Sequence, residues 1–140
     1  MAHQISLFVE NKPGKMAGVM GALRAKAIDV KAFTINSAGT FGVIKLLVNE
    51  PVRAREVLKN TGLAVALVDV VVIVLDELPD GLETISSLFT DQNVNIETAY
   101  GFNSGGHKLL VIETNDADRL KTVCDQQNIP ILTDTQIYAL

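Results

Sequence analysis

The chain has 140 residues, of which 48% are hydrophobic and only 5% are aromatic, so its core must be built mainly from Val, Ile, Leu and Ala. Its net charge of −4 and its pI near 5.1 disfavour a nucleic acid as partner, because binding to a phosphate backbone depends on clustered Lys and Arg. The single cysteine, Cys124, excludes an internal disulfide and a metal site made of several cysteines.

The sequence carries no pattern typical of export or of a membrane span. Its first residues do not form a charged and then apolar leader. The apolar run at residues 63–75 is short for a membrane span and contains Asp69, so we interpret it as two consecutive strands. We therefore expect a cytoplasmic protein that has no membrane partner.

The first half of the chain alternates between strand-like and helix-like patterns. Its opening residues are β-rich and end at a Pro-Gly turn. Apolar residues then recur from Met16 to Ala27 at the spacing of one helical stripe. Pro51 suits the first turn of a second helix, because its missing N–H is not needed there. In order, the pattern predicts a strand at 5–9, a helix at 16–27, strands at 30–35 and 41–48, a helix from Pro51 to Gly62 and a strand at 63–68.

The second half repeats the first half with an offset of 66 residues. Pro13 corresponds to Pro79, and Gly62 corresponds to Asn128. Gly and Asn are the residues that most readily take the left-handed conformation that closes a helix. The repeat predicts a strand at 71–75, a helix at 81–92, strands at 96–102 and 108–113, a helix at 116–127 and a strand at 131–138.

Each half therefore has the βαββαβ order of a ferredoxin-like unit. We predict an α+β fold with two such domains, residues 1–69 and 70–140, each an antiparallel sheet with both helices on one face. Units of this size bury little surface alone, so we expect the two to pack side by side. The exposed sheet edges also need a cover, so we expect a homodimer.

The turn before the first predicted helix is the strongest candidate for a binding site. The helix is expected to begin at or just after Pro13. The N–H groups of Gly14, Lys15 and Met16 then lack partners inside the helix. These groups, the helix dipole and the Lys15 charge suit a carboxylate, and the Asn11 amide can both donate and accept a hydrogen bond. The alternative is an ordinary Pro-Gly turn in which Asn11 caps the helix.

Segments of both halves resemble the ACT domain family. In the first half the resemblance rests on Glu-Asn-Lys-Pro-Gly-Lys-Met at 10–16, Ile-Asp-Val at 28–30 and Phe-Gly-Val-Ile-Lys-Leu-Leu-Val at 41–48. In the second half it rests on Leu-Pro-Asp-Gly-Leu at 78–82 and Val-Asn-Ile at 94–96. It covers almost the whole chain and is greatest to stand-alone tandem ACT proteins. The first half is also similar to the regulatory subunit of acetolactate synthase.

The resemblance implies a regulatory module that binds a small free amino acid. In paired ACT domains, the ligand lies at the seam between the first turn of one copy and the start of the second strand of the other. For one site the matching residues are Asn11, Pro13 and Gly14, with Lys15 and Met16 beside them, together with Asn95 and Ile96. The reciprocal site would use Glu77, Pro79 and Gly81 with Asp29 and Val30.

Charge distinguishes the two sites. The first offers two neutral amides and Lys15, whereas the second gathers Asp29, Glu77 and Asp80, which would repel an incoming carboxylate. Asp80 is also a good residue for a helix N-terminus and would occupy it. We therefore expect one functional site and one degenerate site, with a cation held by Asp29 and Glu77 as the alternative for the second.

No residue pattern supports catalysis. His3 and His107 have no nucleophile or acid partner at an informative spacing, so we expect solvated histidines. Cys124 falls on a helix face, so we expect a buried apolar residue. The sequence therefore predicts no catalytic residue, no cofactor and no metal.

Three aromatic residues, Phe33, Tyr100 and Phe102, fall on strands expected at sheet edges. They would pack in the seam or, as the alternative, stack bases as in an RNA-recognition module, which the acidic charge disfavours. The leading hypothesis is a non-catalytic sensor of a small free amino acid. Its rival is an obligate regulatory subunit of an amino-acid biosynthetic enzyme, without a ligand site of its own.

Overall fold

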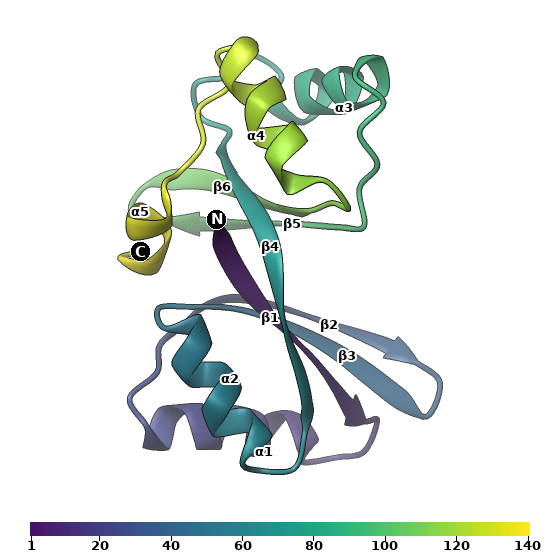
Figure 1. The fold of residues 1–140 in the computed structure, drawn as a ribbon, viewed down its shortest axis with the longest axis vertical. Helices are drawn as coiled ribbons and strands as arrows, with labels where there is room; N and C mark the ends of the chain where they lie inside the picture. Colours follow the sequence, from purple (N-terminus) through teal and green to yellow (C-terminus); the bar gives the residue numbers. More distant parts are fainter. The chain divides into compact units, whose positions relative to one another are not determined.

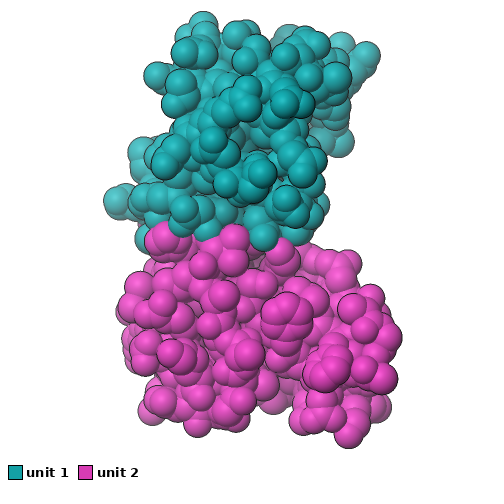
Figure 2. All heavy atoms as spheres, turned by 45° about the vertical axis from the view of Figure 1, so that its right-hand side comes forward, with its two compact units in different colours: residues 1–2, 69–138, 140 teal, residues 3–68, 139 magenta.

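The computed structural model describes residues 1–140, which form two compact units (Figure 1 and Figure 2). The first-repeat unit holds residues 3–68 with Ala139, and the second-repeat unit holds residues 1–2, 69–138 and Leu140. Each unit combines an antiparallel sheet with helices, which confirms the predicted α+β fold. None of the helices is both long and apolar enough to cross a membrane.

In the first-repeat unit, two helices pack on one face of a sheet with the strand order β2-β3-β1-β4. β3 pairs antiparallel with both β1 and β2, so β2 is an edge strand. Ile5, Leu7 and Val9 alternate along β1 and are buried against the helices, where they meet Val19 and Leu23. The elements are β1 (Ala2–Glu10), α1 (Lys15–Ala25), β2 (Val30–Ala38), β3 (Phe41–Val48), α2 (Pro51–Lys59) and the beginning of β4 (Ala64–Val74).

In the second-repeat unit, the later residues of β4 pair antiparallel with β6, and β6 pairs antiparallel with the edge strand β5. Its core joins Ile73 of β4 to Phe89 of the first helix and to Leu120 and Cys124 of the second. The elements after β4 are α3 (Gly81–Asp91), β5 (Thr98–Ser104), β6 (His107–Glu113), α4 (Ala117–Gln126) and α5 (Asp134–Tyr138).

β4 is one continuous strand, so the prediction of two consecutive strands within residues 63–75 is wrong. Asp69 was expected to mark the break. In the structure it is an exposed residue between Val68 and the buried Val70. Successive side chains of a strand point to opposite faces, so a charged residue can face outward without ending the strand.

The turns of the two repeats have the same backbone conformation. Left-handed φ angles, which residues other than glycine rarely adopt, recur in pairs that are 66 residues apart. The left-handed closure predicted at Gly62 and Asn128 is confirmed, and the repeat thus extends from side-chain pattern to backbone geometry. The pairs are Gly14 with Asp80 (86° and 49°), Ala27 with Asn93 (55° and 54°), Gly39 with Gly105 (73° and 58°) and Gly62 with Asn128 (89° and 55°).

The prediction of a last strand at residues 131–138 is wrong. Only Ile131 contributes to the sheet, through a single bridge to Ile73, and the chain then forms the short helix α5. The backbone N–H of Thr133 donates to Gln136 Oε1 at 2.8 Å, and the backbone N–H of Gln136 donates to Thr133 Oγ1 at 3.2 Å. This reciprocal capping box starts the helix. Burial of Ile137, which is 1% exposed, holds the helix in place.

We predict that Thr133→Ala destabilises the protein by about 0.5–2 kcal/mol, the usual cost of removing a helix N-cap side chain. The measurement is the free energy of unfolding from urea denaturation. Thr135→Ala is the matched control, because Thr135 is exposed inside the same helix and makes no hydrogen bond through its hydroxyl. Equal losses in the two variants would contradict the capping role of Thr133.

Candidate functional site

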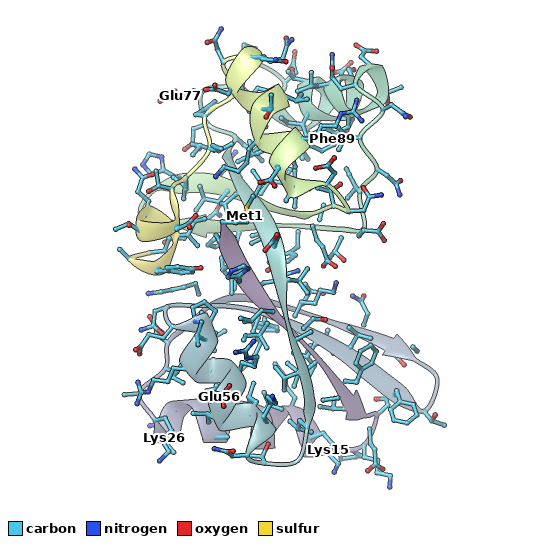
Figure 3. The ribbon with its side chains drawn as sticks, in the orientation of Figure 1. Met1, Lys15, Lys26, Glu56, Glu77 and Phe89 are labelled. Atoms are coloured by element: carbon cyan, nitrogen blue, oxygen red, sulfur yellow. The ribbon has the colours of Figure 1, made fainter.

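The start of α1 lacks a side-chain cap. Gly14 is the N-cap residue, with φ 86° and ψ −12°, and Lys15 is the first helical residue (Figure 3). The backbone N–H groups of Gly14, Met16 and Ala17 donate to no atom of the chain. The N–H of Lys15 has no partner inside the helix, as predicted, but donates to Lys12 O of the preceding turn at 3.3 Å. The helix start thus presents three unpaired donors at the positive end of the helix dipole.

Asn11 does not cap the helix, so the alternative interpretation of this residue is wrong. Its side-chain N–H₂ donates to Ser37 Oγ at 3.0 Å and to Gly39 O at 3.2 Å. Its backbone N–H donates to Thr40 O at 2.9 Å. These bonds attach the turn to the β2–β3 hairpin. They use both amide hydrogens and leave Oδ1 as the polar atom available to a ligand.

One acid and two lysines form ion pairs around this turn. The Glu10 carboxylate lies 2.8 Å from Lys12 Nζ and 3.9 Å from Lys15 Nζ. The hydrogen bond from Lys12 and the charges of both lysines lower the pKa of Glu10. Lys15 therefore has only a distant acid partner and can turn toward an anion. Met16 is partly buried against the core, as its place in the apolar stripe predicted.

A cleft of about 340 Å³ lies beside the start of α1. Gly14, Lys15 and Gly18 form its helical side. A Cβ placed on Gly14 or Gly18 would meet no atom within 4 Å, so the backbone here is open to a neighbouring molecule. The other lining residues are Val9, Val19, Thr61 and Leu63.

The equivalent turn of the second repeat is anchored differently. Asp76 Oδ2 lies 2.7 Å from His107 Nδ1, and Asp76 Oδ1 accepts a hydrogen bond from the backbone N–H of Lys108 at 2.9 Å. His107 thus has an acid partner that its sequence spacing did not reveal, and its side chain is 63% exposed, as predicted for a solvated histidine. His3, also expected to be solvated, is partly buried in β1. The hydrogen bonds from Lys108 and His107 lower the pKa of Asp76.

Asp80 is the N-cap residue of α3 but does not act as a cap. Its φ of 49° is left-handed, and its side chain accepts no hydrogen bond from the helix. Glu77 and Pro79 lie in the loop before it, where Figure 3 labels Glu77, and Gly81 is the first helical residue. A Cβ on Gly81 would come within 3.4 Å of Leu75 O, so a side chain here would be tight. A cleft of about 580 Å³ beside this helix start is lined in part by Asp80, Gly81, Leu82 and Glu83.

The remaining predicted site residues lie at the far ends of the same two helices. Asp29 Oδ2 is 2.6 Å from Lys31 Nζ, and Val30 begins β2. Asn95 and Ile96 lie in the loop before β5, two residues earlier than the observed strand, and Ile96 is 42% exposed. No group of three or more His, Cys, Asp or Glu side chains is placed to hold a metal ion.

Within one repeat, a helix separates the first turn from the start of the second strand, so the predicted site residues of one repeat do not lie together. α1 has 11 residues and so separates the turn at 11–16 from Asp29 and Val30 by about 16 Å along the helix axis. α3 separates the turn at 77–81 from Asn95 and Ile96 in the same way. The pairing of the turn at 11–16 with Asn95 and Ile96 stays a prediction.

Other candidate residues have structural roles. Cys124 is fully buried, and burial raises the pKa of its thiol to about 11, which confirms the prediction of an apolar role. Burial, with the nearby Glu113 carboxylate, also raises the pKa of Tyr100. Phe33 lies on the edge strand β2, and Tyr100 and Phe102 lie on the edge strand β5, as predicted.

Comparisons with known proteins agree with this architecture. The family model of the ACT domain pair matches residues 1–140. Protein BT0572 from Bacteroides thetaiotaomicron has a similar solved structure, with 29% identity, a TM-score of 0.91 and coverage of 99% of this chain and 96% of that one. The ligand-free regulatory subunit of aspartate kinase from Thermus thermophilus has the same fold, with 21% identity, a TM-score of 0.65 and coverage of 90% and 93%. A comparison with curated proteins found no significant match.

We predict that Asp76→Asn lowers stability at neutral pH and that the difference from the parent protein shrinks as the pH falls below about 4. A carboxylate whose pKa is lowered in the folded state stabilises the protein above its unfolded pKa. That contribution is lost as acid protonates the folded form. Asn keeps an acceptor for Lys108 N–H, so the variant tests the charge. The measurement is urea denaturation from pH 2 to 7.

Asp125→Asn is the control for this prediction, because the Asp125 carboxylate makes no hydrogen bond and no ion pair. It should show no stability difference that disappears in acid. A difference for Asp76→Asn that is constant over the whole pH range would contradict the role given to the Asp76 charge.

Proposed function

The chain belongs to the ACT domain pair family, and we propose on this premise that it is a non-catalytic regulatory module of the cytoplasm that binds a small free amino acid. The ligand site would form where two ACT-like repeats meet. The observation that supports this proposal most strongly is the uncapped start of α1, where three backbone donors are unpaired beside an open glycine.

The carboxylate of the ligand would bind at this helix start. It would accept hydrogen bonds from the N–H groups of Gly14, Met16 and Ala17, and Lys15 would add a positive charge. The helix dipole would contribute about 0.3–1 kcal/mol, or up to about 2 kcal/mol for a partly buried carboxylate. The left-handed backbone of Gly14 leaves room for this approach.

The ammonium group of the ligand would bind to Asn11 Oδ1. Both amide hydrogens of Asn11 are held by the β2–β3 hairpin, so the orientation of the amide is set before a ligand arrives. An acceptor whose orientation is already fixed loses less conformational entropy when the ligand binds. Asn95 and Ile96 of the second repeat would complete the site. The Asn95 side chain makes no hydrogen bond within the chain and can bind the ligand.

The affinity that such a site needs is modest. Free amino acids are abundant, so a sensor works with a Kd between micromolar and millimolar, which corresponds to roughly −8 to −4 kcal/mol. Charge-assisted hydrogen bonds contribute about 1.5–3 kcal/mol each before the costs of binding. Two or three of them are sufficient. The ligand would favour one arrangement of the repeats, which a partner protein could recognise.

The reciprocal site, Glu77, Pro79 and Gly81 with Asp29 and Val30, would be degenerate. Three acids, Asp76, Asp80 and Glu83, line the cleft at its helix start against one lysine, Lys108, and would repel a carboxylate. Asp29 is engaged by Lys31 at 2.6 Å. The larger cleft volume of this turn does not offset the unfavourable charge.

The second candidate function is an obligate regulatory subunit of an amino-acid biosynthetic enzyme, without its own ligand site. It is favoured by large hydrophobic side chains that the first-repeat unit exposes on its strands. Phe8, Phe33 and Phe41 are each more than half exposed, at 56%, 55% and 53%. An enzyme or a second copy of the chain would bury them, and the edge strands β2 and β5 also suit a homodimer.

We predict that one or a few of the twenty amino acids raise the melting temperature in a thermal-shift screen and that Asn11→Ala abolishes this effect. Ala removes the acceptor for the ligand and also the two hydrogen bonds to the hairpin. The variant should therefore lose about 1 kcal/mol of stability without ligand. The measurement is the melting temperature with and without each amino acid.

Ser37→Ala is the matched control for Asn11→Ala. It removes one of the hydrogen bonds that hold the Asn11 amide but leaves Asn11 Oδ1 in place. It should reduce stability slightly and keep the response to the amino acid. The absence of any response in the parent protein, together with co-purification of an enzyme, would favour the subunit function instead.

We also predict opposite effects of alanine at two glycines of α1. Gly14→Ala should destabilise the protein by about 1–2 kcal/mol, because a Cβ is unfavourable at positive φ, and should weaken amino-acid binding. Gly21→Ala should stabilise it by about 0.5–1 kcal/mol, because Gly21 is helical and its Cβ meets no atom within 4 Å. Urea denaturation and calorimetric titration measure the two effects. Unchanged binding in Gly14→Ala would contradict the site.

A further inference from the structure

The two repeats share one fold but carry opposite charges. The first-repeat unit contains nine Lys or Arg and four Asp or Glu, which gives it a net charge of +5. The second-repeat unit contains three Lys or Arg and twelve Asp or Glu, which gives it a net charge of −9. The charge of −4 for the whole chain is therefore the difference between a basic unit and an acidic unit. Charge separated in this way affects association with other molecules rather than the fold.

The helices carry much of this difference. In the first-repeat unit, α1 and α2 with their cap residues (14–26 and 50–60) contain six Lys or Arg and two Glu, a net charge of +4. In the second-repeat unit, α3 and α4 with their cap residues (80–92 and 116–127) contain two Lys or Arg and six Asp or Glu, a net charge of −4. We call these surfaces the basic layer and the acidic layer. Their charges are equal and opposite.

Three positive charges of the basic layer have no partner within the chain. Each acid of the first-repeat unit lies 2.6–3.5 Å from a Lys or Arg of the same unit. Arg24, Lys26 and Lys59 are exposed and form no ion pair. Arg24 and Lys26 lie at the end of α1, where Figure 3 labels Lys26, and Lys59 is the last residue of α2. Another molecule can therefore bind these charges without breaking an existing pair.

The acidic layer carries four exposed carboxylates that form no ion pair and no hydrogen bond. They are Glu83 and Asp91 of α3 and Asp118 and Asp125 of α4. The repeat places Asp125 at the position of Lys59, so the sign of the charge is reversed at one helix position. The two layers thus present unpaired charges of opposite sign on equivalent elements.

The helix dipole is the alternative explanation for some of these charges. A base in the last turn of a helix and an acid in the first turn both interact favourably with the dipole. Arg24 and Lys59 lie in last turns, and Glu83 and Asp118 lie in first turns. However, the first-repeat helices have no acid in a first turn, and the second-repeat helices have no base in a last turn. The dipole favours both kinds of residue in every helix, so it does not explain their division between the repeats.

Two acids lie where the helix dipole disfavours them. Asp91 is the last residue of α3, and Asp125 lies in the last turn of α4. A carboxylate near the unpaired carbonyl groups of a helix end is unfavourable, and neither residue has a base as partner within the chain. Contact with positive charges of another molecule would compensate this cost.

Each layer also exposes a large hydrophobic side chain. Val52 of α2 is 55% exposed, and Leu82 of α3 is 62% exposed. Protein interfaces combine apolar contacts at the centre with a polar rim that excludes water. An exposed hydrophobic residue among unpaired charges is therefore typical of a surface that binds another protein.

We propose that the basic layer of one copy of the chain binds the acidic layer of a second copy. Charge complementarity identifies the second copy as the partner, because the same chain carries both surfaces with equal and opposite charge. Contact between like layers would repel, whereas contact between unlike layers attracts. A two-fold axis forms the contact twice, once for each pair of unlike repeats. The proposal does not depend on the amino-acid site.

The first test is the salt dependence of association of the full chain, measured by sedimentation velocity at about 50 mM and about 500 mM NaCl. The Debye length falls from roughly 14 Å to roughly 4 Å over this range, so charges in contact attract less at high salt. The dimer Kd should rise at least tenfold. A monomer at both salt concentrations, or a dimer that salt does not weaken, would overturn the proposal.

The second test is a charge exchange between the layers. The double variants Arg24→Glu with Lys59→Glu, and Glu83→Lys with Asp125→Lys, should each raise the dimer Kd about tenfold or more. All four residues are exposed, so both variants should fold, which circular dichroism checks. An equal mixture of the two variants should recover the parent association. The first variant keeps the acidic layer intact and the second keeps the basic layer intact.

Glu97→Lys is the matched control for the charge exchange. Glu97 is an exposed acid of the same unit, but it lies in the loop before β5 and outside the acidic layer. This variant should associate as the parent does. A loss equal to that of Glu83→Lys, or a mixture that fails to associate, would show that overall charge alone is responsible and would overturn the proposal.

Cross-linking locates the contact. A carbodiimide joins a lysine directly to a carboxylate, and an equal mixture of ¹⁴N and ¹⁵N chains distinguishes links between copies from links within one copy. Links between copies should join Lys26 or Lys59 to acids of α3 or α4. A dimer formed through the edge strands or the exposed phenylalanines would lack these links and would overturn the proposal.

Discussion

A left-handed residue at the start of the first helix of each repeat determines which backbone groups are left for a ligand. A side chain caps a helix when its own residue has an extended conformation, because it then reaches back to the N–H groups of the first turn. Gly14, at φ 86°, has no side chain, and Asp80, at φ 49°, has one that reaches no helical N–H. Both helix starts therefore keep unpaired donors, even where the residue type is a good cap.

The turn before each helix start is attached to the neighbouring hairpin by hydrogen bonds. The first repeat uses a neutral amide, Asn11, and the second uses a carboxylate, Asp76. The residue before the helix has a left-handed φ in both repeats, but the electrostatics of the two turns differ. The neutral anchor leaves the first turn open to an anion, whereas the acidic anchor adds to the negative charge of Asp80 and Glu83. The two repeats thus differ in which side chain attaches the turn to the neighbouring hairpin.

Local periodicity was sufficient to predict nearly all helices and strands, because the 3.6-residue and two-residue patterns occur twice and agree. The missed helix α5 was predicted as a strand because the repeat places residues 131–138 opposite the last strand of the first half, and its Thr133 to Gln136 capping box was the signal that could have identified it. The bonds of Asn11 and Asp76 to the hairpins join residues 26 to 32 positions apart. No local pattern shows such contacts, so the roles of both residues required the structure.

The duplication also shows how equivalent loops can form different hydrogen bonds without a change of fold. Where a valine stands in the first repeat, Val48, two loops exchange hydrogen bonds between the Asp29 and Asn49 backbone N–H groups and oxygens of the other residue. Where a threonine stands in the second, Thr114, its hydroxyl donates to Asn95 O at 2.6 Å, and the backbone N–H groups of Asn95 and Asn115 donate to no atom of the chain. The two side chains have nearly the same shape, so packing is kept while the hydrogen-bond balance changes. The two repeats thus keep one fold while their loops differ in which polar groups the chain itself satisfies.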